Sequence, residues 1–157
     1  MPDKGCFMLE VGPLPGLYSI IHGLDSEDVV EVPDHFHVTL LYGITEPVAP
    51  PQAPAWWRLS RTFGQIKDNS TNTLSIDRKP TLFQNDQFDV LKLDVYDATL
   101  PEMHEDIRTR FETDVNFDYH PHLTIAYLEP GTGRKYLDQT VGVDWLDVVG
   151  ASYNGPE

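Results

Sequence analysis

The chain has very little cysteine, few basic residues and no long apolar run. Its single cysteine, Cys6, cannot form an internal disulfide, which favours a reducing compartment. No stretch approaches the ~18 consecutive apolar residues of a membrane span. The first fifteen residues also lack the apolar core of a signal peptide. We therefore expect a cytoplasmic protein with no membrane partner.

The chain also has few positively charged residues. Eleven Lys and Arg residues face 25 Asp and Glu residues, for a net charge of −14, and no basic run occurs. Because long nucleic acids are held by many Lys and Arg contacts to phosphate, long RNA or DNA is not an expected partner. The chain also lacks a Walker-type phosphate loop and a GxGxxG motif, so nucleotide-cofactor folds are unsupported and no cofactor is expected.

What the chain contains is enough apolar sequence for one globular domain over residues 1–157, with 40% hydrophobic residues. Apolar alternation and turn signals predict strands, and apolar residues at helical spacing predict helices. The predicted strands are 17–21, 35–42, 73–83, 88–96, 120–127 and one within 143–153, and the predicted helices are 56–66 and 99–111. A capping box from Thr99 to Glu102 is expected to start the second helix. Two helices among mostly antiparallel strands indicate an α+β fold.

One short pattern occurs twice. Residues 35–42 read HFHVTLLY and residues 120–127 read HPHLTIAY, so both follow H-x-H-x-T-apolar-apolar-Tyr. A chain of this composition would contain about 0.07 H-x-T triplets with apolar neighbours by chance, so two copies are not accidental. Because side chains alternate along a strand, His37 and Thr39 share one face, as do His122 and Thr124.

These motifs resemble those of the two-histidine (2H) phosphoesterases. The resemblance implies a bilobed fold of two antiparallel sheets with flanking helices, whose pseudo-symmetric lobes enclose one central groove. It also implies a metal-independent phosphodiesterase in which His37, Thr39, His122 and Thr124 are the catalytic residues. The compact chain and its opening further resemble phage-encoded anti-CBASS members, which degrade cyclic di- and trinucleotide immune signals in the host cytoplasm. Other members process 2′,3′-cyclic phosphates at RNA ends or 2′-5′ phosphodiesters in RNA and oligoadenylates, which is the alternative function.

The chemistry of the residues agrees with this resemblance. Histidine titrates near ~6.5, so one imidazole can accept a proton while the other donates one on opposite sides of a phosphorus. The threonine hydroxyls can donate hydrogen bonds to the non-bridging oxygens. The sequence does not assign the base and the acid.

Several aromatic and histidine residues near the motifs are open to two interpretations. Tyr18, Trp57, Tyr42 and Tyr127 are candidates for substrate binding, although Tyr42 and Tyr127 fall on the opposite face of a regular strand, where they would pack in the core. His35 and His120 are expected to be solvated residues at the start of the strands. His104 is expected on the surface of the helix 99–111.

Two other classes of function remain open. The pairs His35-x-His37 and His120-x-His122 could ligate zinc or iron, although a metal site would leave the repeated threonines unexplained. A module that binds a nucleotide without cleaving it would share the same residues.

Overall fold

A computed structural model describes residues 5–45, 73–109, 112–114 and 118–154. Within them, the helices are α1 (Leu17–His22), α3 (Thr99–Arg108) and the short 3-10 helix η1 (Gly133–Tyr136). The strands are β1 (Gly5–Val11), β2 (Val29–Glu31), β3 (His37–Ile44), β4 (Thr73–Ile76), β5 (Thr81–Gln84), β6 (Asp89–Tyr96), β7 (His122–Leu128) and β8 (Trp145–Asn154). The predicted helix 56–66 and Trp57 lie outside the described residues.

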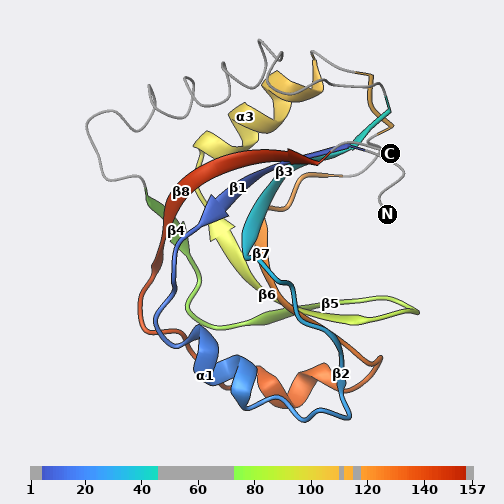
Figure 1. The fold of residues 1–157 in the computed structure, drawn as a ribbon, viewed down its shortest axis with the longest axis vertical. Coiled ribbons are helices and arrows are strands. Elements are labelled where there is room, and N and C mark those ends of the chain that lie inside the picture. Colours follow the sequence, from blue (N-terminus) through green and yellow to red (C-terminus); the bar gives the residue numbers. More distant parts are fainter. Residues whose placement is uncertain (1–4, 46–72, 110–111, 115–117, 155–157) are drawn as a thin grey trace.

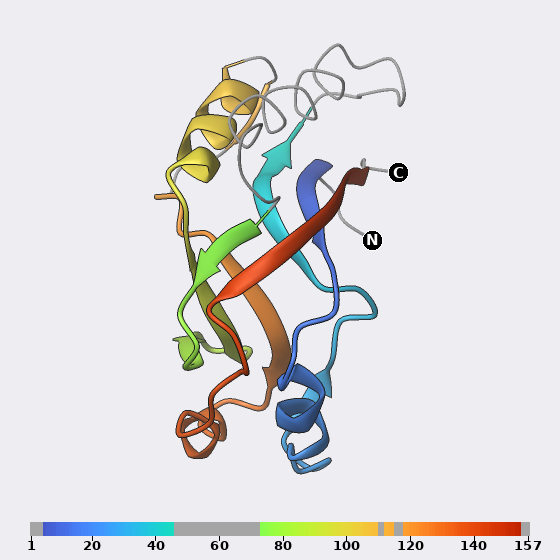
Figure 2. The same ribbon diagram turned by 90° about the vertical axis from the view of Figure 1, so that its left-hand side faces the viewer.

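The strands pair antiparallel in the order β2-β7-β3-β1-β8-β4-β6-β5. β6 also pairs with β7, which closes a ring of paired strands in the order β7-β3-β1-β8-β4-β6. The α+β class is therefore confirmed. A division into two separate sheets is not confirmed, because the pairings connect all eight described strands. Figure 1 shows the curved sheet with α3 at one end and α1 at the other, and Figure 2 shows the same arrangement from the side.

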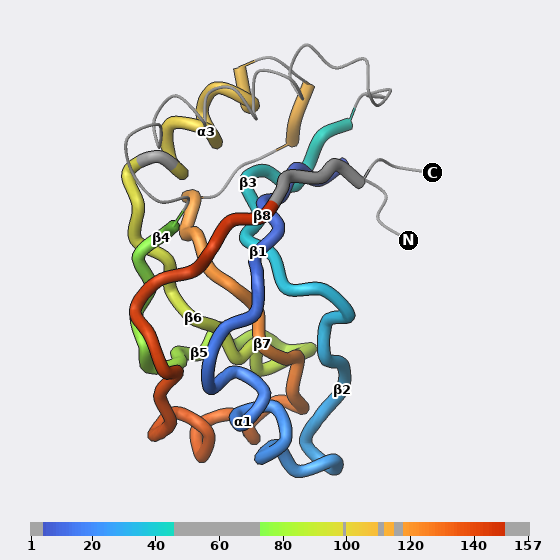
Figure 3. The backbone as a smooth tube through the Cα atoms, turned by 60° about the vertical axis from the view of Figure 1, so that its left-hand side comes forward, coloured from blue at the N-terminus to red at the C-terminus, as the bar shows by residue number. Residues whose placement is uncertain are grey.

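Two pairs of strands repeat each other in register. In the β1–β3 pair, Met8 lies opposite Thr39 and Glu10 opposite His37. The β6–β7 pair places Lys92 opposite Thr124 and Asp94 opposite His122 in the same way. Figure 3 shows the four strands running through the middle of the molecule. The duplication seen in the motifs thus extends to the neighbouring strands β1 and β6.

Burial follows the predicted alternation on β6 and the predicted apolar stripe on α3. Leu91, Leu93 and Val95 are buried on β6, and Leu100, Met103 and Ile107 are buried on α3. Helix α3 begins at Thr99, with Ala98 as N-cap and no side-chain capping hydrogen bond, so the predicted capping by Thr99 is wrong.

Residues 17–21 form a helix and not the predicted strand. The left-handed φ of 89° at Gly16 turns the chain into α1, and a Cβ there would lie 3.0 Å from the Gly142 nitrogen. Leu17 and Ile20 are both buried, as residues three apart on one helix face should be. The β-propensity of this segment is overridden by the turn and by packing against the core.

The remaining differences concern strand boundaries. The predicted strand 73–83 is interrupted by a turn and forms β4 and β5, while β1 was not predicted at all. Both motif strands begin at the second histidine of their motif, so the first histidine lies just before the strand. None of the helices that the structure describes is long and apolar enough to cross a membrane.

Candidate active site

The two motif strands lie side by side and antiparallel. Val38 pairs with Leu123, and both side chains are fully buried. The residues that flank this pair therefore face the other side of the sheet, where all four are half-buried. They are His37 and Thr39 on β3 and His122 and Thr124 on β7. Continuing the antiparallel register places His37 across from Thr124 and Thr39 across from His122. Each histidine thus faces the threonine of the other motif, and we call this the crosswise arrangement.

A β-bulge follows the threonine in each motif strand. The β1–β3 register shifts between Phe7 and Met8, and the β6–β7 register shifts between Leu91 and Lys92. One extra residue in a strand reverses the alternation beyond it. Tyr42 and Tyr127 consequently line the same pocket as the motif residues, and their predicted place on the opposite face is wrong.

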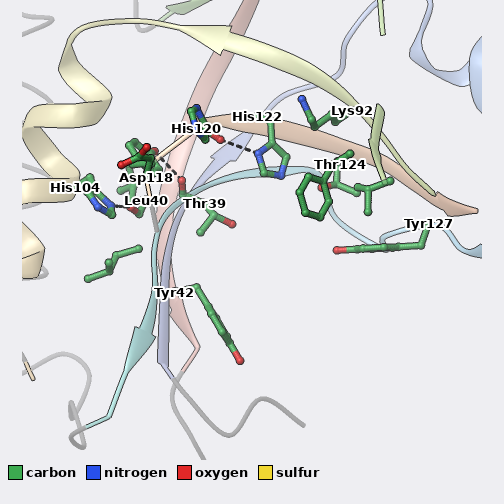
Figure 4. Close-up of a pocket in the computed structure, with 14 residues that line it drawn as sticks. Thr39, Leu40, Tyr42, Lys92, His104, Asp118, His120, His122, Thr124 and Tyr127 are labelled. Atoms are coloured by element: carbon green, nitrogen blue, oxygen red, sulfur yellow. Dashed lines mark hydrogen bonds between the residues drawn. The ribbon is translucent and has the colours of Figure 1, made fainter. Parts of the chain in front are cut away.

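The pocket has a volume of about 360 Å³. Its wall includes Thr39, Tyr42, Lys92, His122, Thr124 and Tyr127, as Figure 4 shows. His37 is not part of this wall and lies two residues from Thr39 on β3. Phe83 on β5, which is 56% exposed, adds an aromatic ring that the sequence did not suggest.

Both motif histidines are oriented by the same local contact. Nδ1 of His37 lies 3.4 Å from the carbonyl oxygen of His35, and Nδ1 of His122 lies 2.8 Å from that of His120. A carbonyl oxygen only accepts hydrogen bonds, so Nδ1 carries the hydrogen in both rings. Nε2 is then the nitrogen that can exchange a proton with a substrate. The first histidines of the motifs are exposed and orient the second histidines through their backbone carbonyls, and His120 also lines the pocket.

Burial lowers the pKa of His37. The bond to the His35 carbonyl and the negative charge of Glu10 raise this pKa in part, while a positive charge on His122 lowers it further. His37 is therefore held toward its neutral form, which is the form that accepts a proton.

Two side chains support β3 at its bulge. The Tyr119 hydroxyl donates to the Thr39 carbonyl at 2.7 Å, and Nδ1 of His104 lies 2.6 Å from the Leu40 carbonyl. The two rings stack with centroids 4.2 Å apart. His104 is buried, so its predicted surface position is wrong. Its spacing of four residues from Leu100 places it on the apolar stripe of α3, which is a signal that the sequence contained.

A half-buried ion pair next to the second motif was not predicted from the sequence. Lys92 and Asp94 on β6 lie opposite Thr124 and His122, and their charged groups are 2.5 Å apart. The repeat of the motif strands extends to β1 and β6, because residues 6–11 read CFMLEV and residues 90–95 read VLKLDV. That comparison would have identified β1 as a strand and β6 as the second half of the site.

The other candidates lie elsewhere. Tyr18 is 62% exposed on α1, packs its ring against His22, and does not line the pocket. Among the described residues, no three His, Cys, Asp or Glu side chains are grouped as a metal site requires.

Comparison with known proteins finds a similarity of fold to solved structures. No protein-family model and no curated protein sequence matches the chain. The fold is similar to that of Kluyveromyces marxianus Usb1 in a solved structure, with a TM-score of 0.46 and 9% sequence identity. The similarity covers 83% of this chain and 73% of that chain. An assignment of function therefore depends on the geometry of the site itself.

Proposed function

We propose that this protein is a metal-independent phosphodiesterase that cleaves a small nucleotide, most specifically a cyclic di- or trinucleotide. The observation that carries the proposal is the crosswise arrangement of two histidines and two threonines on one face of two paired strands. A phosphate above the Val38–Leu123 pair would have an imidazole on each side and a hydroxyl on each side. In-line displacement at phosphorus requires this distribution of a base, an acid and hydrogen-bond donors.

In the proposed mechanism, neutral His37 is the base and protonated His122 is the acid. His37 Nε2 removes the proton from the ribose 2′-hydroxyl, whose oxygen attacks the adjacent 3′-phosphate. His122 Nε2 protonates the departing 5′-oxygen, so the products are a 2′,3′-cyclic phosphate and a free 5′-hydroxyl. Water can then open the cyclic phosphate with the two histidines in exchanged roles. Thr39 and Thr124 donate hydrogen bonds to the non-bridging oxygens, where negative charge increases.

Charge and aromatic side chains support a small substrate. At a net charge of −14, the protein is unsuited to long RNA, whereas a compact nucleotide needs only a local site. Tyr42 and Phe83 are 42% and 56% exposed, and both line the pocket together with Tyr127. Stacking of a base on such a ring contributes ~1–3 kcal/mol. Processing of RNA ends or of 2′-5′ oligoadenylate uses the same catalytic residues and is the second candidate.

A substrate comparison tests the proposal. The protein is incubated separately with cyclic di- and trinucleotides, 2′-5′ oligoadenylate and a short RNA with a 2′,3′-cyclic end, and the products are resolved by mass. We expect linear products with 2′,3′-cyclic or 2′/3′-phosphate ends from the cyclic nucleotides. Processing of the RNA end or the oligoadenylate alone would favour the second candidate. Recovery of every compound intact, with one of them bound, would favour a binding module.

The pH profile tests the roles of the histidines. Because burial lowers the pKa of His37, the base stays unprotonated below the usual value of ~6.5. The pH profile of kcat/KM should be bell-shaped, because it depends on the pKa values of both histidines. Its acid limb should lie below pH ~6.5. Activity should be unchanged in EDTA. An acid limb above pH ~7, or loss of activity on chelation, would contradict this mechanism.

A further inference from the structure

The two halves of the site repeat each other except at one position that carries charge. Glu10 and Asp94 are acidic at equivalent places, opposite the two motif histidines. Opposite the two motif threonines, however, β1 presents Met8 and β6 presents Lys92. Met8 is buried and uncharged, so of the two strands β1 and β6 only β6 places a cation opposite a motif threonine. A ligand in this groove consequently meets two chemically different ends.

Lys92 is held in place by its neighbours. Its side chain is 15% exposed, and Nζ lies 2.5 Å from Asp94 Oδ1 and 2.9 Å from Thr81 Oγ1. The Thr81 hydroxyl in turn donates to Asp94 Oδ2 at 3.0 Å. An ammonium group has three donors, so these contacts leave one donor for another acceptor. The carboxylate of Asp94 offsets the cost of burying most of the lysine side chain.

The position of Lys92 distinguishes it from the four motif residues. It lies across from Thr124 on the next strand and lines the pocket, where Figure 4 shows it beside His122 and Thr124. Its bond to Thr81 ties the ammonium toward β5, on the side of β6 away from β7. Lys92 therefore lies on the strand beyond the Val38–Leu123 pair, beside the motif residues of β7. Among the described residues of the pocket wall, Lys92 is the only Lys or Arg.

We propose that Lys92 binds a second phosphate of the substrate, next to the phosphate that lies between the histidines. Lys92 is then a specificity residue for small nucleotides with at least two phosphates, and it determines which end of the substrate lies along β6. The incoming phosphate accepts the unused donor of the ammonium, while Asp94 and Thr81 keep the group in position. This inference rests on the proposed phosphodiesterase function for the identity of the ligand, but binding alone tests it.

The test measures binding in a His37→Ala background, in which cleavage does not interfere. Calorimetry gives Kd for a cyclic dinucleotide, with two phosphates, and for a 3′-mononucleotide, with one. Loss of a hydrogen bond to a charged group corresponds to about a 10–100-fold change in affinity. Lys92→Met should therefore raise Kd for the dinucleotide about 10–100-fold, and should change Kd for the mononucleotide by less than about threefold. Equal losses for both ligands, or no loss for either, would overturn the proposal.

Two further variants separate binding from stability. Lys79→Met removes the same charge from the exposed β4–β5 turn and should leave both Kd values unchanged. Asp94→Asn keeps an oxygen acceptor near Lys92 and retains the ammonium group, so it should bind the dinucleotide more tightly than Lys92→Met does. If the ion pair were only structural, Lys92→Met and Asp94→Asn would weaken binding together and lower Tm together. A protein that binds the dinucleotide through Lys92 without cleaving it would refute the proposed enzyme and leave this inference standing.

Discussion

Replacing His122 with alanine is expected to lower kcat by ~10²–10⁴ while leaving the fold intact, because a positioned acid or base contributes a factor of this size. His37→Ala is expected to have an effect of similar size. Both side chains are half-buried on the groove face and neither is part of the hydrophobic core, so their loss should leave Tm nearly unchanged. Turnover of the best substrate and circular dichroism measure the two expectations.

His35→Ala is a matched control for His37→Ala. Its side chain is exposed, and the contact with His37 Nδ1 is made by the backbone carbonyl, which the substitution retains. Activity within about threefold of the parent is expected, in contrast to the ~10² loss at His37. Undiminished turnover in His37→Ala or His122→Ala, with a matching circular dichroism spectrum, would remove the histidines from the mechanism.

The largest expected effect on stability comes from Asp89. Its side chain is 1% exposed at the start of β6, and Oδ2 accepts hydrogen bonds from the backbone N–H of Gly131 at 3.1 Å and of Gly133 at 2.9 Å. Asp89→Ala leaves the buried N–H of Gly133 without an acceptor, which costs about 1–3 kcal/mol of unfolding free energy. Since small domains are stable by ~5–15 kcal/mol, the loss should be obvious in urea unfolding.

Two other variants calibrate this result. Asp89→Asn retains an acceptor oxygen and should lose less stability than Asp89→Ala. Asp138→Ala removes an almost fully exposed carboxylate from a 3.8 Å contact with Lys79, and should change the unfolding free energy by less than about 0.5 kcal/mol. Similar losses for Asp89→Ala and Asp138→Ala would show that the bonds of Asp89 to the 131–133 turn are not important for stability.

Local spacing determined the features that repeat within a few residues. The H-x-T pattern predicted that His37 and Thr39 share a strand face, and the structure has them on one face of β3. The spacing of Leu100, Met103 and Ile107 predicted the buried face of α3. These predictions are confirmed because side-chain direction within a helix or strand depends on its period alone.

Partner strands decided where the tyrosines lie. Tyr42 and Tyr127 reach the pocket because β3 and β7 each have a bulge, and a bulge exists only relative to the strand beside it. Regular alternation predicted the opposite face for both residues. The sequence of a single strand does not show whether the strand is regular or bulged, because the extra residue exists only relative to the paired strand.

The other features missed by local spacing depend on contacts between distant segments. Helix α1 forms where the sequence favoured a strand, because Gly16 packs against residues 141 and 142. His104 is buried because α3 docks beside the Leu40 carbonyl. Lys92 joins the site because β6 closes the ring against β7. The sequence by itself identified the residues proposed for the chemistry and predicted the face that they share. The tertiary structure alone decided their neighbours, because pairing between strands depends on the whole chain and not on local periodicity.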